Sequence, residues 1–155
     1  MTHTDLPAPL DAGTRPSPHR MRKVFNDSHR GMNLFKAGDY DQAAEVPRGV
    51  LATAPDNDFA LDLLANSLMH QGRFDEAVPM LRRVVAEGPG WPGSWFNLGW
   101  SLVEIGERDA SLEPLRHAVA LAPYEEQFRR LLIEMLRDRG HEEEARALEA
   151  ASRDA

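Results

Sequence analysis

The chain has 155 residues, of which 42% are hydrophobic and 28% charged, a composition typical of one globular domain. It contains no cysteine, which excludes disulfides, thiolate nucleophiles and cysteine-ligated metal sites. No apolar run approaches the ~18 residues of a membrane span, and the net charge of −7 argues against a nucleic-acid binder. We therefore expect neither a membrane nor a nucleic acid as partner.

The first twenty residues lack the apolar segment of a secretory signal. Four prolines occur there instead: Pro7, Pro9, Pro16 and Pro18. Residues 1–36 hold six Lys/Arg against three Asp/Glu, so a basic front precedes an acidic body. We expect residues 1–20 to form a disordered, solvated tail, residues 21–155 to form the folded domain, and the protein to be cytoplasmic.

Glycines recur at a fixed spacing along the rest of the chain. Four of them lie 34 residues apart: Gly38, Gly72, Gly106 and Gly140. Prolines and small residues keep the same register: Pro55, Pro89 and Pro123, and also Ala43, Ala77, Ser111 and Ala145. Self-similarity at such a period is the signature of a repeat architecture. The sequence thus predicts units of about residues 24–57, 58–91, 92–125 and 126–153.

Each unit carries two apolar stripes at helical spacing, one on either side of its glycine. Leu61, Leu64 and Leu68 recur one period later as Trp95, Leu98 and Leu102. We expect the glycine to end the first helix in a left-handed conformation. An acidic residue three positions later is expected to open the second helix, in the series Asp41, Asp75, Asp109 and Glu143, with the aspartates as N-caps. Each unit is therefore predicted to be a helix–turn–helix.

These residues resemble the tetratricopeptide repeat family. The third unit carries the clearest match, with the residues that the family expects at Trp95, Leu98, Gly99, Leu102, Gly106, Leu115, Ala118 and Pro123. The resemblance extends over about residues 21–153. It implies an all-α fold, a right-handed superhelical solenoid of about four units, in which the first helices line a concave groove. In this family the groove commonly holds a segment of a partner protein.

Two positions depart from the family pattern. Pro47 lies inside the second helix of the first unit, where the family has a large apolar residue. An interior proline costs a helix about 3 kcal/mol, so we expect this helix to be kinked or split near Val46. Glu149 takes an apolar position in the last unit, which is typical of a terminal repeat that has no further neighbour to bury against.

The resemblance directs attention to first-helix residues outside the leucine stripe. Those implied to line the groove are Phe25, Met32, Phe59, Asn66, Phe96, Asn97, Trp100 and Arg130. Aromatic and methionine side chains are typical interface anchors. A groove that changes from apolar to Arg-bearing favours a segment with hydrophobic anchors followed by an acidic or carboxylate end. The alternative is that Phe25, Phe59 and Phe96 pack between units as ordinary core.

Some members of the family grip a C-terminal carboxylate with two asparagines and several basic residues. Asn66 and Asn97 match the asparagines, but Asp62, Gln127 and Leu131 stand where the basic residues belong. Without charge-assisted hydrogen bonds, such a carboxylate clamp is disfavoured.

Trp91 lies at the junction between the second and third units, directly before Pro92. We expect its ring to pack over the joint between the two units. The alternative is an exposed ring that serves as a contact point for a partner.

Catalytic motifs are absent from the sequence. It has no phosphate-binding glycine loop, no His-Glu-x-x-His pair and no Gly-x-Ser-x-Gly elbow, and its six histidines are scattered. We predict no catalytic residue, no metal site and no cofactor, and hence not an enzyme. The predicted function is an adaptor, scaffold or chaperone-like module that binds another protein or peptide. The alternatives are a secretion-substrate chaperone, a self-assembling homo-oligomer, and an accessory subunit of an enzyme or a small enzyme of unrecognised type.

Overall fold

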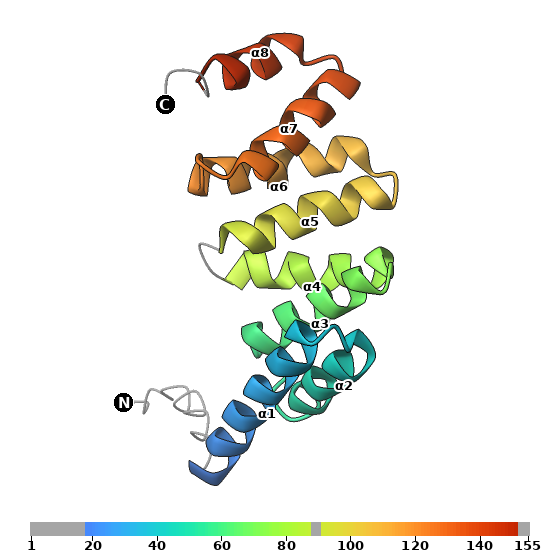
Figure 1. Cartoon of the computed structure of the whole chain (residues 1–155), viewed down its shortest axis with the longest axis vertical. Helices are drawn as coiled ribbons and strands as arrows, with labels where there is room; N and C mark the ends of the chain where they lie inside the picture. Colours follow the sequence, from blue (N-terminus) through green and yellow to red (C-terminus); the bar gives the residue numbers. More distant parts are fainter. Residues whose placement is uncertain (1–17, 88–90, 152–155) are drawn as a thin grey trace, which may run out of the picture.

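The computed structural model describes residues 18–87 and 91–151, and within these ranges the chain forms eight α-helices and no strand (Figure 1). The helices pair into four units: α1 (Pro18–Lys36) with α2 (Tyr40–Leu51), α3 (Asp58–His70) with α4 (Phe74–Glu87), α5 (Pro92–Glu104) with α6 (Arg108–Leu121), and α7 (Glu126–Asp138) with α8 (Glu142–Ala151). The all-α solenoid of four helix–turn–helix units is confirmed. Helix α1 starts at Pro18, inside the segment predicted as a tail, and residues 1–17 lie outside the described residues.

The turn inside each unit is made by the periodic glycine. Gly38, Gly72, Gly106 and Gly140 have φ angles of 81°, 74°, 86° and 82°, and among the described residues only glycines have positive φ. A side chain at these positions would strain the left-handed backbone. The 34-residue glycine spacing therefore marks four copies of one turn, as predicted.

The predicted N-caps of the second helices are wrong by two residues. Asp39 caps α2, because its Oδ1 accepts a hydrogen bond from the backbone nitrogen of Gln42 at 3.1 Å. Asp41 lies in the first turn instead, and Asp75, Asp109 and Glu143 have equivalent places in α4, α6 and α8. The cap comes earlier because each second helix begins almost directly after the glycine turn. The first-turn carboxylates still face the positive end of the helix, as expected.

Helix α2 runs without a break from Tyr40 to Leu51 and includes Pro47, so of the two outcomes predicted near Val46, a kink or a split, the split does not occur. Pro47 is fully buried, and Val50, one turn beyond it, is also in the core. Proline deletes a single backbone hydrogen bond. Burial of the two side chains supplies stabilisation of comparable size, which keeps the last turn helical.

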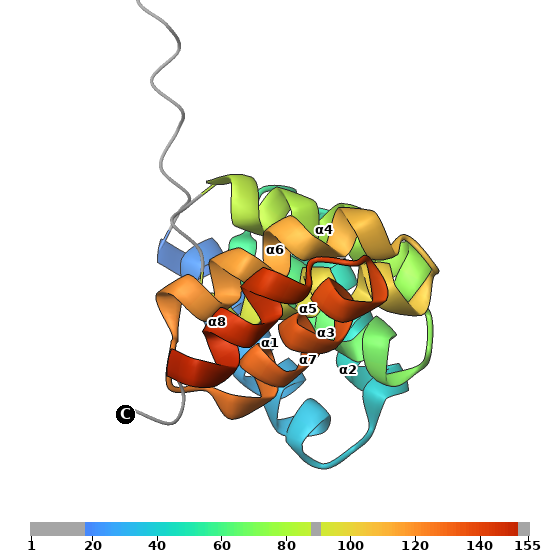
Figure 2. The same cartoon turned by 90° about the horizontal axis from the view of Figure 1, so that it is seen from above.

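Consecutive helices pack on one another along the whole solenoid, and the first helices also meet across units, α1 on α3 and α3 on α5. Seen along the long axis, α3, α5 and α7 lie near the centre, and α4 and α6 lie together at one side (Figure 2). The core is formed by two clusters of buried residues, one centred on the second unit and one on the third and fourth. Trp95 packs against both and so joins them.

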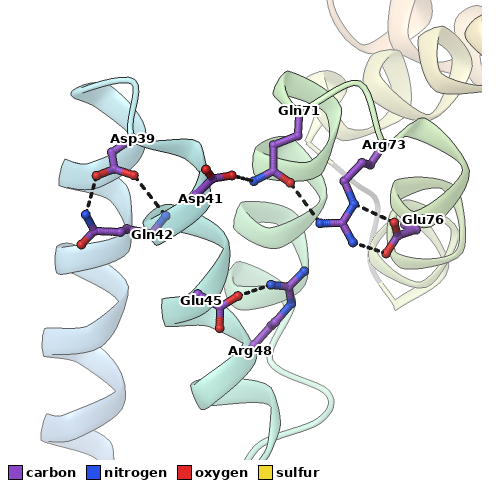
Figure 3. A network of polar contacts seen from close by, with 8 residues as sticks. All are labelled: Asp39, Asp41, Gln42, Glu45, Arg48, Gln71, Arg73 and Glu76. Atoms are coloured by element: carbon purple, nitrogen blue, oxygen red, sulfur yellow. Dashed lines mark hydrogen bonds and ion pairs between the residues drawn. The ribbon is translucent and has the colours of Figure 1, made fainter.

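The edge of the solenoid that carries the glycine turns is held by polar bonds between units. The side chain of Gln71 donates to Oδ1 of Asp41 at 2.8 Å, and Arg73 bonds both Gln71 and Glu76 (Figure 3). The same pattern recurs between the third and fourth units, where Arg139 donates to Asp109 at 2.7 Å. These groups are exposed, so each pair contributes little stability by itself. Their arrangement makes this edge charged, with carboxylates bonded to neighbouring arginine and glutamine side chains.

Candidate partner-binding surface

An open cleft of about 880 Å³ lies between α1, the α2–α3 connection and the start of α3. Apolar side chains form much of its lining, contributed by Val24, Phe25, Met32 and Phe59. His29 and Lys36 add polar groups along the α1 wall. A concave, mainly apolar site with a few polar groups has the general character of a ligand- or segment-binding site.

Two exposed aromatic side chains flank the cleft, one on α1 and one on α3. Phe25 and Phe59 occupy the same register position one period apart, and they leave 63% and 46% of their surfaces exposed. The ring of Phe25 has an edge-on contact with His29 at a centroid distance of 4.4 Å. Both phenylalanines are therefore exposed rather than packed in the core between units.

A chain of polar side chains runs across the first helices of the second and third units. Ser94 Oγ donates to Oδ1 of Asp62 at 2.9 Å, and Asn66 Nδ2 donates to Oδ2 of Asp62 at 3.0 Å. Asn97 Nδ2 in turn donates to Oδ1 of Asn66 at 2.6 Å. The two asparagines thus bond each other, and the Asp62 carboxylate, which lies between Ser94 and Asn66, accepts only neutral donors.

The Asp62 carboxyl is the one group in this polar chain with a displaced pKa. Burial raises the pKa above its ordinary value, and the hydrogen bonds from Ser94 and Asn66 oppose this effect only in part. No ion pair to Asp62 occurs among the described residues. The folded state therefore disfavours the ionised carboxylate.

Replacing Asp62 with asparagine, its neutral isostere, should raise the free energy of unfolding at neutral pH. Because the folded pKa is raised, the wild-type carboxyl contributes most below the ordinary aspartate pKa of about 4 and loses that contribution as the pH rises through the folded pKa. The advantage of Asp62→Asn should accordingly grow from pH 4 upward and then level off. Urea unfolding at several pH values measures this difference.

Glu134→Gln supplies the control, because it neutralises an exposed carboxylate outside this polar chain. It should give no comparable gain at neutral pH. A larger stabilisation by Asp62→Asn in acid than at neutral pH would contradict the raised pKa of Asp62.

The remaining predicted groove residues lie in varied surroundings. Phe96 stacks on Phe128 at 4.5 Å and packs against the core of the third and fourth units. Trp100 is half-buried beside Phe96, and its indole Nε1 donates to Glu104 Oε1 at 3.0 Å. Arg130 is exposed and forms no ion pair with a described residue. Among the anchors, only Phe25, Met32 and Phe59 come together in one cleft.

The sequence patterns did not predict that the α2–α3 connection contributes to the cleft. Thr53, Ala54 and Asn57 line the cleft opposite α1. The periodic Pro55 marks this segment as a repeated loop, but the family resemblance pointed only to first helices. The periodic Pro55 was the signal that could have identified this loop, because a loop that joins two units lies beside the cleft between them.

Three of the histidines, His29, His70 and His117, take part in aromatic contacts. His29 contacts Phe25, and His70 stacks on Tyr40 at a centroid distance of 4.5 Å. Over residues 18–87 and 91–151, no group of three or more possible metal ligands occurs. None of the described helices combines the length and apolar character needed to cross a bilayer.

Known proteins with related sequence or structure agree with this geometry. Residues 34–98 match the sequence model of the tetratricopeptide repeat family. A MamA structure from Desulfovibrio magneticus RS-1 is similar with a TM-score of 0.76, at 23% identity over 84% of this chain and 74% of that chain. Another structure, MamA AMB-1, gives a TM-score of 0.74, at 27% identity over 84% of this chain and 72% of that chain. No curated protein matches the sequence significantly.

The stacked helix pairs and the open surface on their first helices define a helical-repeat protein, a class of architecture whose curved surfaces commonly bind other proteins. Residues 34–98 thus match the tetratricopeptide repeat family in sequence, and the solved structures show that a similar helical solenoid extends over most of the chain.

Proposed function

We propose that this protein is a non-catalytic adaptor that holds an apolar segment of another protein in the cleft between α1 and α3. The observation that carries the proposal is the cleft itself, with Phe25 and Phe59 as exposed walls. Burying a phenylalanine side chain is worth about 1.5–3 kcal/mol, so the two rings are able to supply much of a micromolar affinity.

From the cleft, the bound segment would continue along the first helices toward α7. The side-chain oxygen of Asn97 accepts no hydrogen bond from a described residue and is placed to accept one from the backbone of a partner. Trp100 offers a half-buried aromatic surface beyond it, and Arg130, which forms no ion pair with a described residue, offers a cation. A segment with hydrophobic anchors followed by an acidic end fits this order. A cytoplasmic location stays a prediction.

The cleft is tested with a photo-crosslinking amino acid placed at position 25 and, separately, at position 105. Ile105 is the control because its exposed side chain lies in the α5–α6 turn, outside the cleft. In lysate of the native cells, the position-25 probe should crosslink a distinct protein and the position-105 probe should not. Mass spectrometry identifies the crosslinked partner and its segment.

The variant Phe25→Ser/Phe59→Ser should weaken binding of that identified segment by at least about tenfold, because two exposed anchors are lost. Both side chains are exposed, so the variant is expected to fold, and circular dichroism checks this. Unchanged affinity would reject the cleft as the binding site. Crosslinks between copies of the chain alone would favour the homo-oligomer instead.

A further inference from the structure

The edge opposite the glycine turns carries a second exposed apolar surface. It consists of Trp91 at the start of α5, Leu121 at the end of α6 and Tyr124 in the α6–α7 connection, here called the aromatic edge. These side chains are 80%, 47% and 86% exposed, respectively. The expectation that Trp91 packs over the joint between units is therefore wrong. Trp91 is the N-cap residue of α5, ahead of Ser94, the first buried residue of that helix.

Helix packing brings Trp91 and Leu121 to the same end of the α5–α6 pair. Helices α5 and α6 are antiparallel, and Trp95 stacks on His117 across them at 4.4 Å. Trp91 lies four residues before Trp95, and Leu121 four residues after His117, so each is about one turn away in the same direction. Tyr124 follows three residues after Leu121. Large apolar groups gathered in this way usually mark an interaction surface, whereas scattered ones do not.

Unpaired acidic side chains surround the aromatic edge. They are Asp58, Glu87, Glu125 and Glu126, all exposed and without an ion-pair partner among the described residues. Of the nearby arginines, Arg83 is paired with Asp56 at 2.7 Å, whereas Arg129 donates to the neutral backbone oxygen of Pro123 at 3.0 Å and keeps its charge. Arg130 lies a turn further into α7. On the glycine-turn edge, by contrast, carboxylates such as Glu76 and Asp109 are paired with arginines.

We propose that the aromatic edge is a second docking surface, and that it binds a basic amphipathic segment of a separate protein. The apolar side of such a segment covers Trp91, Leu121 and Tyr124, and its Lys or Arg side chains pair with the surrounding carboxylates. The excess of unpaired acid selects a cationic partner and disfavours an acidic one. This surface is distinct from the cleft at Phe25, so the chain is able to join two proteins.

The test uses a fluorescent amphipathic peptide made of leucine and lysine, with a leucine–glutamate peptide of the same pattern as the charge control. Anisotropy should show binding of the leucine–lysine peptide that weakens as salt is added. The variant Trp91→Ser/Tyr124→Ser should weaken this binding by at least about tenfold, because both aromatic anchors are removed. Both side chains are largely exposed, and circular dichroism verifies that the variant keeps its fold.

Two further variants make the outcome specific. Ile105→Ser removes an exposed apolar side chain from the other edge and should leave the affinity unchanged. Phe25→Ser alters the cleft and should also leave it unchanged, which separates this surface from the proposed adaptor site. Equal binding by wild type and Trp91→Ser/Tyr124→Ser, or equal binding of the two peptides, overturns the proposal. So does a wild-type dimer that becomes monomeric in Trp91→Ser/Tyr124→Ser, because the edge would then bind a second copy.

Discussion

Replacing Leu115 with alanine should lower the free energy of unfolding by about 3 kcal/mol, within the range of about 2–5 kcal/mol seen for buried leucines. Leu115 is fully buried in the cluster that holds the third and fourth units together. The loss combines the transfer free energy of the missing methyl groups with the cavity that they leave. Urea unfolding followed by circular dichroism measures it.

Leu121→Ala is the matched control because it removes the same atoms from the same helix at an exposed position. Its effect should stay within about 0.5 kcal/mol. Equal losses for Leu115→Ala and Leu121→Ala would show that the α5–α6 joint does not carry the stability assigned to it.

Replacing Gly99 with alanine should cost about 2 kcal/mol, although alanine is the better helix former. A β-carbon at position 99 would lie 2.6 Å from both Cγ and Cδ2 of Leu115, and 3.4 Å from its backbone nitrogen. Helices α5 and α6 must therefore move apart, or Leu115 must leave its position. Thermal and urea unfolding report the loss.

Gly49→Ala should instead raise the free energy of unfolding. A β-carbon there meets no atom within 4 Å, and α2 gains up to about 1 kcal/mol of helix propensity. In a Leu115→Ala background, Gly99→Ala should lose most of its cost, since the clashing side chain is gone. A double-mutant cycle should show this coupling as about 1 kcal/mol or more. Additive losses would mean that the two residues do not meet.

The register of the repeat already predicted much of the packing. Positions 81 and 115 are equivalent, and both leucines are fully buried. The equivalent position in the last unit is Glu149, which is only partly buried and forms an ion pair with Arg137 at 2.9 Å. At the equivalent position in the first unit, Pro47 is buried in an unbroken helix, which local propensity did not predict.

The candidate site was predicted only in part, because exposure depends on neighbours that are distant in sequence. Phe59 and Phe96 were proposed for the same role from their positions on first helices. Phe96 meets Phe128 of the next unit and joins the core, whereas Phe59 faces the open cleft beside α1. The polar chain from Ser94 to Asn97 likewise depends on how α3 and α5 stack.

By itself, the sequence determined the repeat length, the helix pairs and the glycine turns, because these depend on local periodicity and on backbone conformations that only glycine adopts readily. The tertiary structure alone decided which aromatic side chains are covered and which carboxyl is desolvated. It also decided which edge keeps carboxylates without ion-pair partners among the described residues. These properties follow from the stacking of one unit on the next. No pattern within a single unit specifies that geometry.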